Sequence, residues 1–215
     1  MIVATPDGAI ASVAERVSKH LPLPRAIVHC AGAHGVGPLL SCARVGVAVG
    51  VMHPLVSFAS SKRTPALNGT TFVIAGDKRA TALARRAAAA VGAHVLIVDR
   101  KALGPCYHAA AALCANGSVA LTTFAVDLLE GLGIARRDAE RALGGLLRSV
   151  ADNVERLGVP AALTGPIARG DFSTVAAHRA ALRSVPAVLN AYDRITPLIV
   201  AAAKRTTKPP RRKPR

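Results

Sequence analysis

A short segment between two apolar helical patterns concentrates charge where a simple connector would need none. Thr164–Asp171 contains a Gly-Pro turn, followed by Arg169 and Asp171 two residues apart. Polar groups held on a short constrained loop indicate recognition. The alternative is that the loop only caps helices. A guanidinium matches both carboxylate and phosphate geometry, so Arg169 is a candidate for binding an anionic group. Asp171 either orients Arg169 or caps the next helix, and we favour the cap.

A second set of candidate residues lies on one predicted helix, Cys106–Glu130. At about 100° per residue, His108, Asn116 and Thr123 fall within about 80° of one another. Because the ordinary pKa of histidine lies near neutrality, His108 is a candidate acid/base. A histidine and an asparagine on a buried helix also need polar partners, so a structural hydrogen bond to a neighbouring helix is the competing interpretation.

The remaining candidates follow apolar runs in the first half of the chain. They are Thr5-Pro6-Asp7, His29-Cys30-Ala31-Gly32 and His53-Pro54. Functional residues of open α/β sheets lie at the carboxyl ends of strands, which is where these phrases are expected. His53 has an equally good alternative as a loop residue whose ring bonds a backbone carbonyl.

Alternating short apolar runs and helical patterns predict the elements that position these residues. The predicted strands are Ile2–Thr5, Ala26–Cys30, Val45–Met52, Thr71–Ala75 and His94–Val98. The predicted helices among them are Asp7–Lys19, Gly37–Arg44 and Lys78–Val91. Strands alternating with helices predict a parallel-type α/β sheet with both faces covered.

After Gly104-Pro105 the pattern contains no convincing strand. Further helices are predicted at Arg136–Leu157, from a cap at Ser173 or Thr174 to Ser184, and at Ala187–Lys204. We therefore predict an α/β domain at 1–103, a helical C-terminal domain at 104–203, and a disordered basic tail at 204–215.

The chain has 215 residues, 51% of them hydrophobic, which is enough to bury a substantial core. Its net charge is +16, and seven of its 28 basic residues lie between Lys204 and Arg215 without an acidic residue among them. The tail is interpreted as solubilising. Non-specific contact with nucleic-acid phosphates is a weaker possibility, because no aromatic residue there could stack on bases.

The cysteines and one long uncharged stretch bear on location. Cys30, Cys42, Cys106 and Cys114 form no Cys-x-x-Cys pair and no zinc-finger spacing, so we expect buried thiols in a reducing, cytoplasmic compartment and no metal site. Residues 102–126 carry no charged residue and are long enough to span a bilayer. Their polar content favours a helix buried in a soluble helical domain over a membrane span.

Read in order, these phrases resemble a known family. The upstream phrases, together with Tyr107-His108-Ala109-Ala110-Ala111, Asn116, Ala162–Asp171 and His178, are similar to Rossmann-like proteins with a C-terminal helical domain of unknown function. That family resembles the wider group of NAD(P)-dependent dehydrogenases that act on phosphogluconate and other β-hydroxyacids, pyrroline-carboxylate and prephenate. The resemblance covers nearly the whole chain to about residue 190.

The resemblance implies a nucleotide, NADP or NAD, in the α/β domain, a cleft against the helical domain, and often a homodimer through the helices. It implies that Thr5, Pro6, Asp7 and Gly32 bind the cofactor. His53, His108 and Asn116 would face a small-molecule substrate as catalytic residues. Arg169, with Asp171, would hold an anionic substrate group or a cofactor phosphate.

Two departures from that pattern limit what it implies. No Gly-x-Gly-x-x-Gly occurs in the sequence, so the glycine-rich first βαβ unit is missing, and roughly fifty to sixty residues of a dinucleotide-binding half would be absent. The Rossmann-like domain is then partial, from a truncated gene, a late-called start or divergence. The β-hydroxyacid dehydrogenases also place a catalytic lysine four residues before a helix asparagine, where this chain has Ala112.

Three functions therefore stay open. The first is an NAD(P)-dependent oxidoreductase-like protein of unknown substrate. The second is a non-catalytic binding or scaffold protein that keeps the fold with an incomplete cofactor site. The third, resting on the tail alone, is a basic protein associated with nucleic acid.

Overall fold

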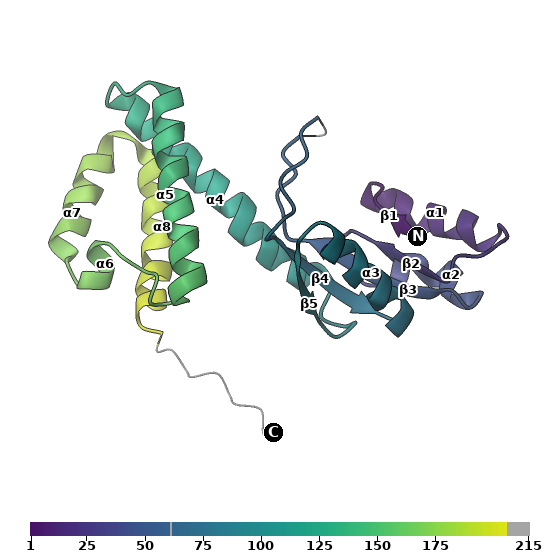
Figure 1. Cartoon of the computed structure of the whole chain (residues 1–215). Coiled ribbons are helices and arrows are strands. Elements are labelled where there is room, and N and C mark those ends of the chain that lie inside the picture. The colour runs from purple at the N-terminus through teal and green to yellow at the C-terminus, as the bar shows by residue number, and fades with distance from the viewer. Residues whose placement is uncertain (61, 206–215) are drawn as a thin grey trace. The chain divides into compact units, whose positions relative to one another are not determined.

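The computed structural model of the chain describes residues 1–60 and 62–205. The chain divides into two compact units, the first ending at Gly117 and the second beginning at Ser118. This division falls within one long helix (Figure 1). The domain boundary at 103/104 stays a prediction. Most of the predicted tail, at 206–215, lies outside the described residues.

The first unit is built on a five-stranded sheet in the order β1-β2-β3-β4-β5. Its strands are β1 (Ile2–Val3), β2 (Ala26–His29), β3 (Ala48–Pro54), β4 (Thr71–Gly76) and β5 (His94–Ile97). Its helices are η1 (Asp7–Ala9), α1 (Ile10–Ser18), η2 (Gly37–Leu39), α2 (Leu40–Arg44) and α3 (Lys78–Ala90). The apolar runs thus form strands close to where the sequence predicts them.

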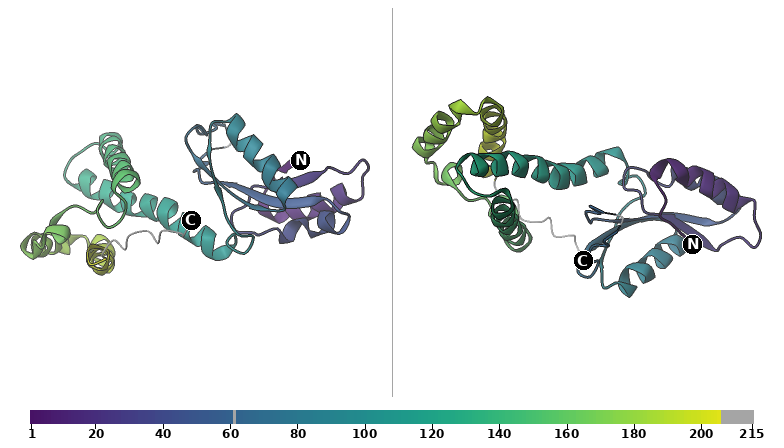
Figure 2. Two further views of the ribbon diagram at one scale, coloured as in Figure 1. Left: turned by 60° about the horizontal axis from the view of Figure 1, so that its bottom comes forward. Right: turned by 90° about the horizontal axis from the view of Figure 1, so that it is seen from above.

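Helices cover both faces of this sheet, as the apolar strands require (Figure 2). On one face, Ile10 and Ala14 of α1 and Cys42 of α2 pack against Ile27 and Val49. On the other face, the alanines of α3 pack against Val28, Phe72 and Ile74 and their neighbours. Ala80, Ala84 and Ala88 recur every four residues, so α3 lies close to the strands along one stripe.

The sheet is mostly parallel, as predicted, with one antiparallel pair of strands that the sequence does not indicate. β1, β2 and β3 are parallel, and so are β4 and β5, but β3 pairs with β4 in the antiparallel sense. A parallel connection needs a crossover, usually a helix. The described residues between Pro54 and Thr71 form no helix, so the chain turns back directly beside β3.

The antiparallel pair contains a very close approach between two glycines. Gly50 pairs with Gly76 across the ladder. A Cβ on Gly76 would lie 2.5 Å from Gly50 Cα and 2.5 Å from the Val49 carbonyl oxygen. Next to this contact, Asp77 Oδ2 accepts the Val49 amide at 2.8 Å and its Oδ1 accepts Arg100 Nη1 at 2.8 Å. One carboxylate therefore joins β3 to the segment that follows β5.

The helices that follow are α4 (Pro105–Gly131), α5 (Arg136–Leu157), α6 (Pro166–Arg169), α7 (Phe172–Ala181), η3 (Leu182–Ser184) and α8 (Pro186–Ala203). In the second unit, α7 and α8 are joined by a forked ion pair, in which Arg179 Nε and Nη2 donate to the Asp193 carboxylate at 2.7 and 3.0 Å. A His178 Nδ1–Tyr192 hydroxyl hydrogen bond of 3.0 Å joins the same two helices.

The expectation that the long helix is buried is wrong for the single chain. Val126 is the one buried residue of α4. Within the described residues, α4 is the one helix long and apolar enough to cross a membrane by length and composition, and 6% of its most apolar window is buried. Composition indicates that such a helix needs covering, but it does not indicate whether the same chain covers it. The polar stripe is partly satisfied within the helix, since the Thr123 hydroxyl donates to the Val119 carbonyl at 3.1 Å.

Candidate functional site

The structure brings several predicted site residues together around one cavity in the first unit. The cavity has a volume of about 660 Å³. It lies between the end of β3, the segment after it and the first turns of α4. His53, Tyr107, His108 and Asn116 supply polar groups to its lining. The two phrases that the sequence separates by some fifty residues therefore meet, because β3 ends beside the start of α4.

His53 is the residue that joins the elements of this site. It belongs to β3 itself, which runs two residues further than predicted, to Pro54. Its Nδ1 is hydrogen bonded to the Tyr107 hydroxyl at 2.8 Å, and the two rings meet edge to face with centroids 5.5 Å apart. The His108 ring lies 6.2 Å from it. The hydrogen bond of the His53 ring therefore goes to a side chain. The alternative, in which the ring bonds a backbone carbonyl, does not describe this contact.

The imidazole of His53 occupies the space where a side chain at residue 32 would lie. A Cβ on Gly32 would be 2.7 Å from His53 Nε2 and within 2.9 Å of two ring carbons. Gly32 comes shortly after β2, so the loop at the carboxyl end of β2 supports the histidine at the end of β3. From the sequence, Gly32 is predicted to lie at a strand end as a cofactor-binding residue. The sequence does not indicate its contact with His53 or a role for Tyr107.

His29, at the end of β2, holds the same loop from inside. Its side chain is fully buried. Its Nδ1 accepts the Ala31 amide at 3.2 Å, and its Nε2 lies 2.9 Å from the Gly35 carbonyl oxygen. An amide can only donate and a carbonyl can only accept, so the ring is neutral and carries its proton on Nε2. Burial lowers the pKa of His29, which keeps that neutral form at physiological pH.

Burial also keeps the polar pair at the cavity uncharged. It lowers the pKa of His53, and the nearby His108 lowers the pKa of His53 further, while Asp7 opposes both effects. Burial raises the pKa of the Tyr107 phenol. At neutral pH the pair is therefore an imidazole and a phenol sharing one hydrogen bond, able to offer or accept one proton.

The predicted cofactor residues lie at the neighbouring strand ends. Thr5, Pro6 and Asp7 follow β1 and are exposed. An Asp7 carboxylate oxygen lies 3.4 Å from His34 Nε2, which connects this strand end to the loop after β2. The binding of the nicotinamide and ribose end of a dinucleotide by Thr5, Pro6 and Asp7 stays a prediction. The sequence contains no Gly-x-Gly-x-x-Gly motif of the kind that holds a pyrophosphate.

The structure places Arg169 and Asp171 in the second unit, around a single helical turn. The predicted loop contains α6, which ends at Gly170 in the left-handed conformation. Asp171 caps α7: its Oδ1 accepts the Thr174 amide at 3.1 Å and the Ser173 hydroxyl at 2.7 Å. Hydrogen bonds from Thr174 and Ser173 lower the pKa of Asp171 to about 2. Ser173 and Thr174 thus donate to the cap, which corrects the prediction that one of them is the cap.

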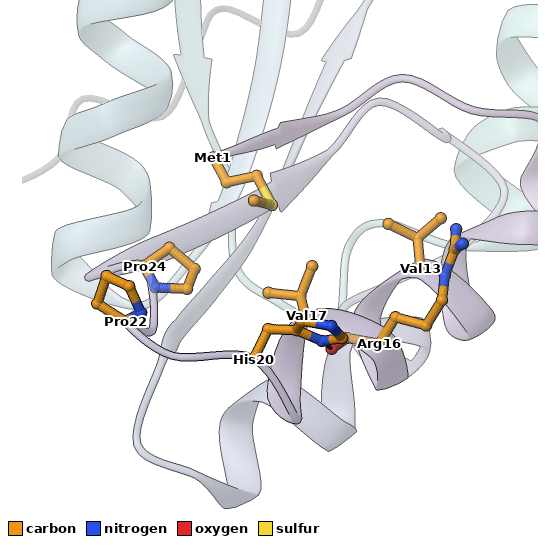
Figure 3. Close-up of a pocket in the computed structure, with 7 residues that line it drawn as sticks. All are labelled: Met1, Val13, Arg16, Val17, His20, Pro22 and Pro24. Carbon is orange, nitrogen blue, oxygen red and sulfur yellow. Dashed lines mark hydrogen bonds between the residues drawn. The ribbon is translucent and has the colours of Figure 1, made fainter.

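A second hollow of about 350 Å³ lies near β1 and contains no predicted site residue. Side chains of α1 and of the segment after it surround Met1 there, among them Val17, His20 and Pro22 (Figure 3). The His20 ring, just after α1, is hydrogen bonded to the Arg16 carbonyl of that helix at 2.7 Å. The chemistry-bearing residues gather at the opposite, carboxyl ends of the strands.

A Rossmann-like α/β sheet unit followed by a helical C-terminal part defines the class of protein, in agreement with the fold predicted from the sequence. Residues 70–199 match the model of the family described as domain of unknown function DUF2520. The chain belongs to this family. Comparison with curated proteins finds no match.

Solved structures share this fold across nearly the whole chain. Protein TM1727 from Thermotoga maritima is 27% identical with a TM-score of 0.73, and the match covers 94% of this chain and 77% of that one. A proposed NADP oxidoreductase from Bacteroides fragilis is 22% identical with a TM-score of 0.68, covering 93% and 74%. Pyrroline carboxylate reductase from Plasmodium falciparum, with NADP bound, is 15% identical with a TM-score of 0.57, covering 94% and 79%.

The buried neutral His29 predicts that acid destabilises the fold. Its pKa in the folded state is lower than the unfolded value of about 6.5, so the unfolded chain binds more protons below that pH. We expect the free energy of unfolding, measured by urea titration, to fall as the pH drops from neutrality through about 6.5, by at most about 1.4 kcal/mol per pH unit for each such histidine. His29→Gln should make this dependence shallower, and the exposed His20→Gln should not. Equal slopes for wild type and His29→Gln would contradict the assignment.

The contact between Gly32 and His53 predicts a specific effect of adding one methyl group. In Gly32→Ala the new Cβ displaces the imidazole and breaks the bond to Tyr107, at a cost of about 1 kcal/mol. Urea unfolding measures that cost, and the His53 ring resonance in an NMR spectrum reports the movement. Gly37→Ala is the matched control, because nothing lies within 4 Å of a Cβ there. In a His53→Ala background the same substitution should cost nothing; an unchanged cost there would sink the explanation.

Proposed function

We propose that the protein is an NAD(P)-dependent oxidoreductase acting on a small molecule that binds in the cavity of the first unit. The observation that carries the proposal is the meeting of His53, Tyr107, His108 and Asn116 around one cavity at the carboxyl end of β3. Support also comes from proteins of similar structure, which include a proposed NADP oxidoreductase and a pyrroline carboxylate reductase with NADP bound.

In this proposal each residue has a role that suits its chemistry. A nicotinamide cofactor, when bound, supplies or accepts a hydride. His53 and His108 exchange the accompanying proton, with His53 oriented by its bond to Tyr107. Asn116 offers an amide to the substrate. Because Ala112 cannot exchange a proton, the proton does not come from the helix position that other dehydrogenases of this type use.

The cofactor would be held at the neighbouring strand ends. Thr5, Pro6 and Asp7 are proposed to contact its nicotinamide and ribose end. Gly32 would contribute through its backbone, since the His53 ring fills the space at its Cα. Arg169 is exposed, and we propose that it binds an anionic group of the cofactor or substrate. Its neighbour Asp171 is proposed to support it by fixing the start of α7.

We also propose that the protein forms a homodimer through its helical part in the cytoplasm. Leu146, Val150, Val154 and Leu157 lie within about 80° on α5 and are each at least 43% exposed. An apolar stripe of this kind indicates a surface that is covered by a partner. Cys30, Cys42 and Cys106 are free thiols, which suits a reducing compartment, although Cys106 and Cys114 are exposed and not buried as the sequence predicts.

The cofactor proposal is tested by titrating NADPH and following its own fluorescence, which the absence of tryptophan leaves unobscured. We expect saturable binding, and we expect Arg169→Ala to weaken it about tenfold, because a charge-assisted hydrogen bond to an anion contributes about 1.5–3 kcal/mol. The thermal midpoint should be nearly unchanged. Arg183→Ala, at another exposed arginine of the second unit, is the control. Absence of saturation at about 1 mM would rule out a working nucleotide site.

The dimer proposal is tested by light scattering on the full chain after size exclusion. The wild type should have twice the 22.0 kDa mass of one chain. Val150→Glu should shift it to the single-chain mass, because it places a charge in the apolar stripe. Arg148→Glu introduces the same carboxylate on the opposite side of α5 and should leave the dimer intact. A wild-type chain that elutes with the mass of one copy would refute the proposal.

A further inference from the structure

Among the described residues, the lining of the cavity has no side chain with a fixed charge. None of the fourteen described residues that line it is Asp, Glu, Lys or Arg, although the whole chain carries a net charge of +16. Much of the wall is aliphatic or aromatic, from Pro54, Leu55, Val56, Phe58 and the alanines of α4. The positive side chains that make the chain basic therefore lie outside the described lining of this cavity.

The polar groups of the cavity suit a neutral hydrogen-bonding ligand. Because His53 Nδ1 and the Tyr107 hydroxyl share one hydrogen, the pair has one donor left to offer. If the hydroxyl donates to the ring, the ring keeps its proton on Nε2; if the ring donates, the phenol proton is free. His108 and Asn116 add a further imidazole and an amide. Both histidine and tyrosine are held in their neutral forms by burial, as described above.

We propose that this cavity binds the uncharged carbonyl group of a ketone or aldehyde that carries an apolar body. This inference rests on the proposed reductase function and deepens it by naming the substrate class. The carbonyl oxygen accepts the donor of the His53–Tyr107 pair, and the apolar body packs against the segment after β3 and the alanines of α4. Reduced nicotinamide, if bound beside the cavity, would supply a hydride to the carbonyl carbon and would itself be oxidised. The His53–Tyr107 pair would donate a proton to the carbonyl oxygen, so that an alcohol forms.

A carboxylate or an ammonium group fits this cavity poorly. Either ion would leave water without finding an opposite charge among the lining residues, and desolvating an unpaired ion costs several kcal/mol. A carbonyl loses much less on leaving water and recovers it through one hydrogen bond. The selectivity of the cavity therefore comes from the absence of compensating charge.

The experiment follows the histidine ring resonances of the isotopically labelled full chain by NMR, with assignments from His53→Gln and His108→Gln. The probes are acetophenone, an aryl ketone, and benzoate, a carboxylate of nearly the same size. We expect acetophenone to shift the His53 and His108 signals saturably. Benzoate should have an apparent Kd at least about tenfold higher. Both titrations are repeated in Arg169→Ala, which removes the proposed anion-binding arginine of the second unit.

A matched pair of variants separates binding from general effects. Tyr107→Phe removes the bonded hydroxyl, so the Kd for acetophenone should rise about three- to tenfold, with benzoate unchanged. Tyr192→Phe removes the equivalent hydroxyl from the other histidine–tyrosine pair, with His178 on α7, and should change neither. Urea unfolding of both variants checks that the fold persists.

The outcomes are separable from those of the cofactor titration. Binding of acetophenone without binding of NADPH would support the neutral-ligand site and contradict the proposed reductase function. NADPH binding with benzoate bound as tightly as acetophenone at His53, in wild type and in Arg169→Ala alike, would overturn the inference and leave the reductase standing. Failure of both probes to shift the His53 or His108 signals would also overturn it.

Discussion

The arrangement of the first unit depends on the close approach of β3 and β4 at Gly50 and Gly76. With no side chain at either position, the backbones pack so tightly that a Cβ on Gly76 would lie 2.5 Å from its neighbour. β3 pairs in parallel with β2 on one side and, across this contact, antiparallel with β4 on the other. Asp77 secures this reversal by bonding the Val49 amide and Arg100 together. Because β4 runs antiparallel to β3, the chain returns to the sheet without a crossover helix. No helix from that connection then covers the end of β3.

That open strand end is where the site forms. β3 carries Val49 and Val51 on the face that packs with α1, α2 and Leu103, and the alternation of a strand puts His53 on the same face. His53 then meets Tyr107 at the start of α4. Gly32 provides the room, and the neutral His29 fixes the loop that contains it. The catalytic proposal thus rests on a histidine whose place is set by the ends of β2 and β3 and by the start of α4.

Much of this architecture could be predicted from the sequence, because local patterns carry it. The apolar runs and the four-residue alanine spacing of α3 identify strands and a helix within a few residues. The pairing direction of β3 and β4 could not be predicted in the same way. It depends on whether the segment that connects the two strands forms a crossover helix. The contact between Gly32 and His53 joins residues far apart in the sequence and has no local signal. The role of Asp171 was predicted correctly as a cap, because side-chain capping is a local interaction.

The exposure of α4 shows a second feature that local sequence patterns do not determine. Apart from the polar stripe of His108, Asn116 and Thr123, most of its side chains are apolar, and such a helix must be covered somewhere. The single chain covers little of it beyond Val126. Its first turns instead supply alanines and His108 to the cavity, where an apolar wall is useful because it excludes water and unpaired ions. A helix with large side chains at these positions would fill the cavity, and one with charged side chains would change what it admits. The small uncharged residues of α4 are therefore consistent both with helix packing and with a neutral ligand site.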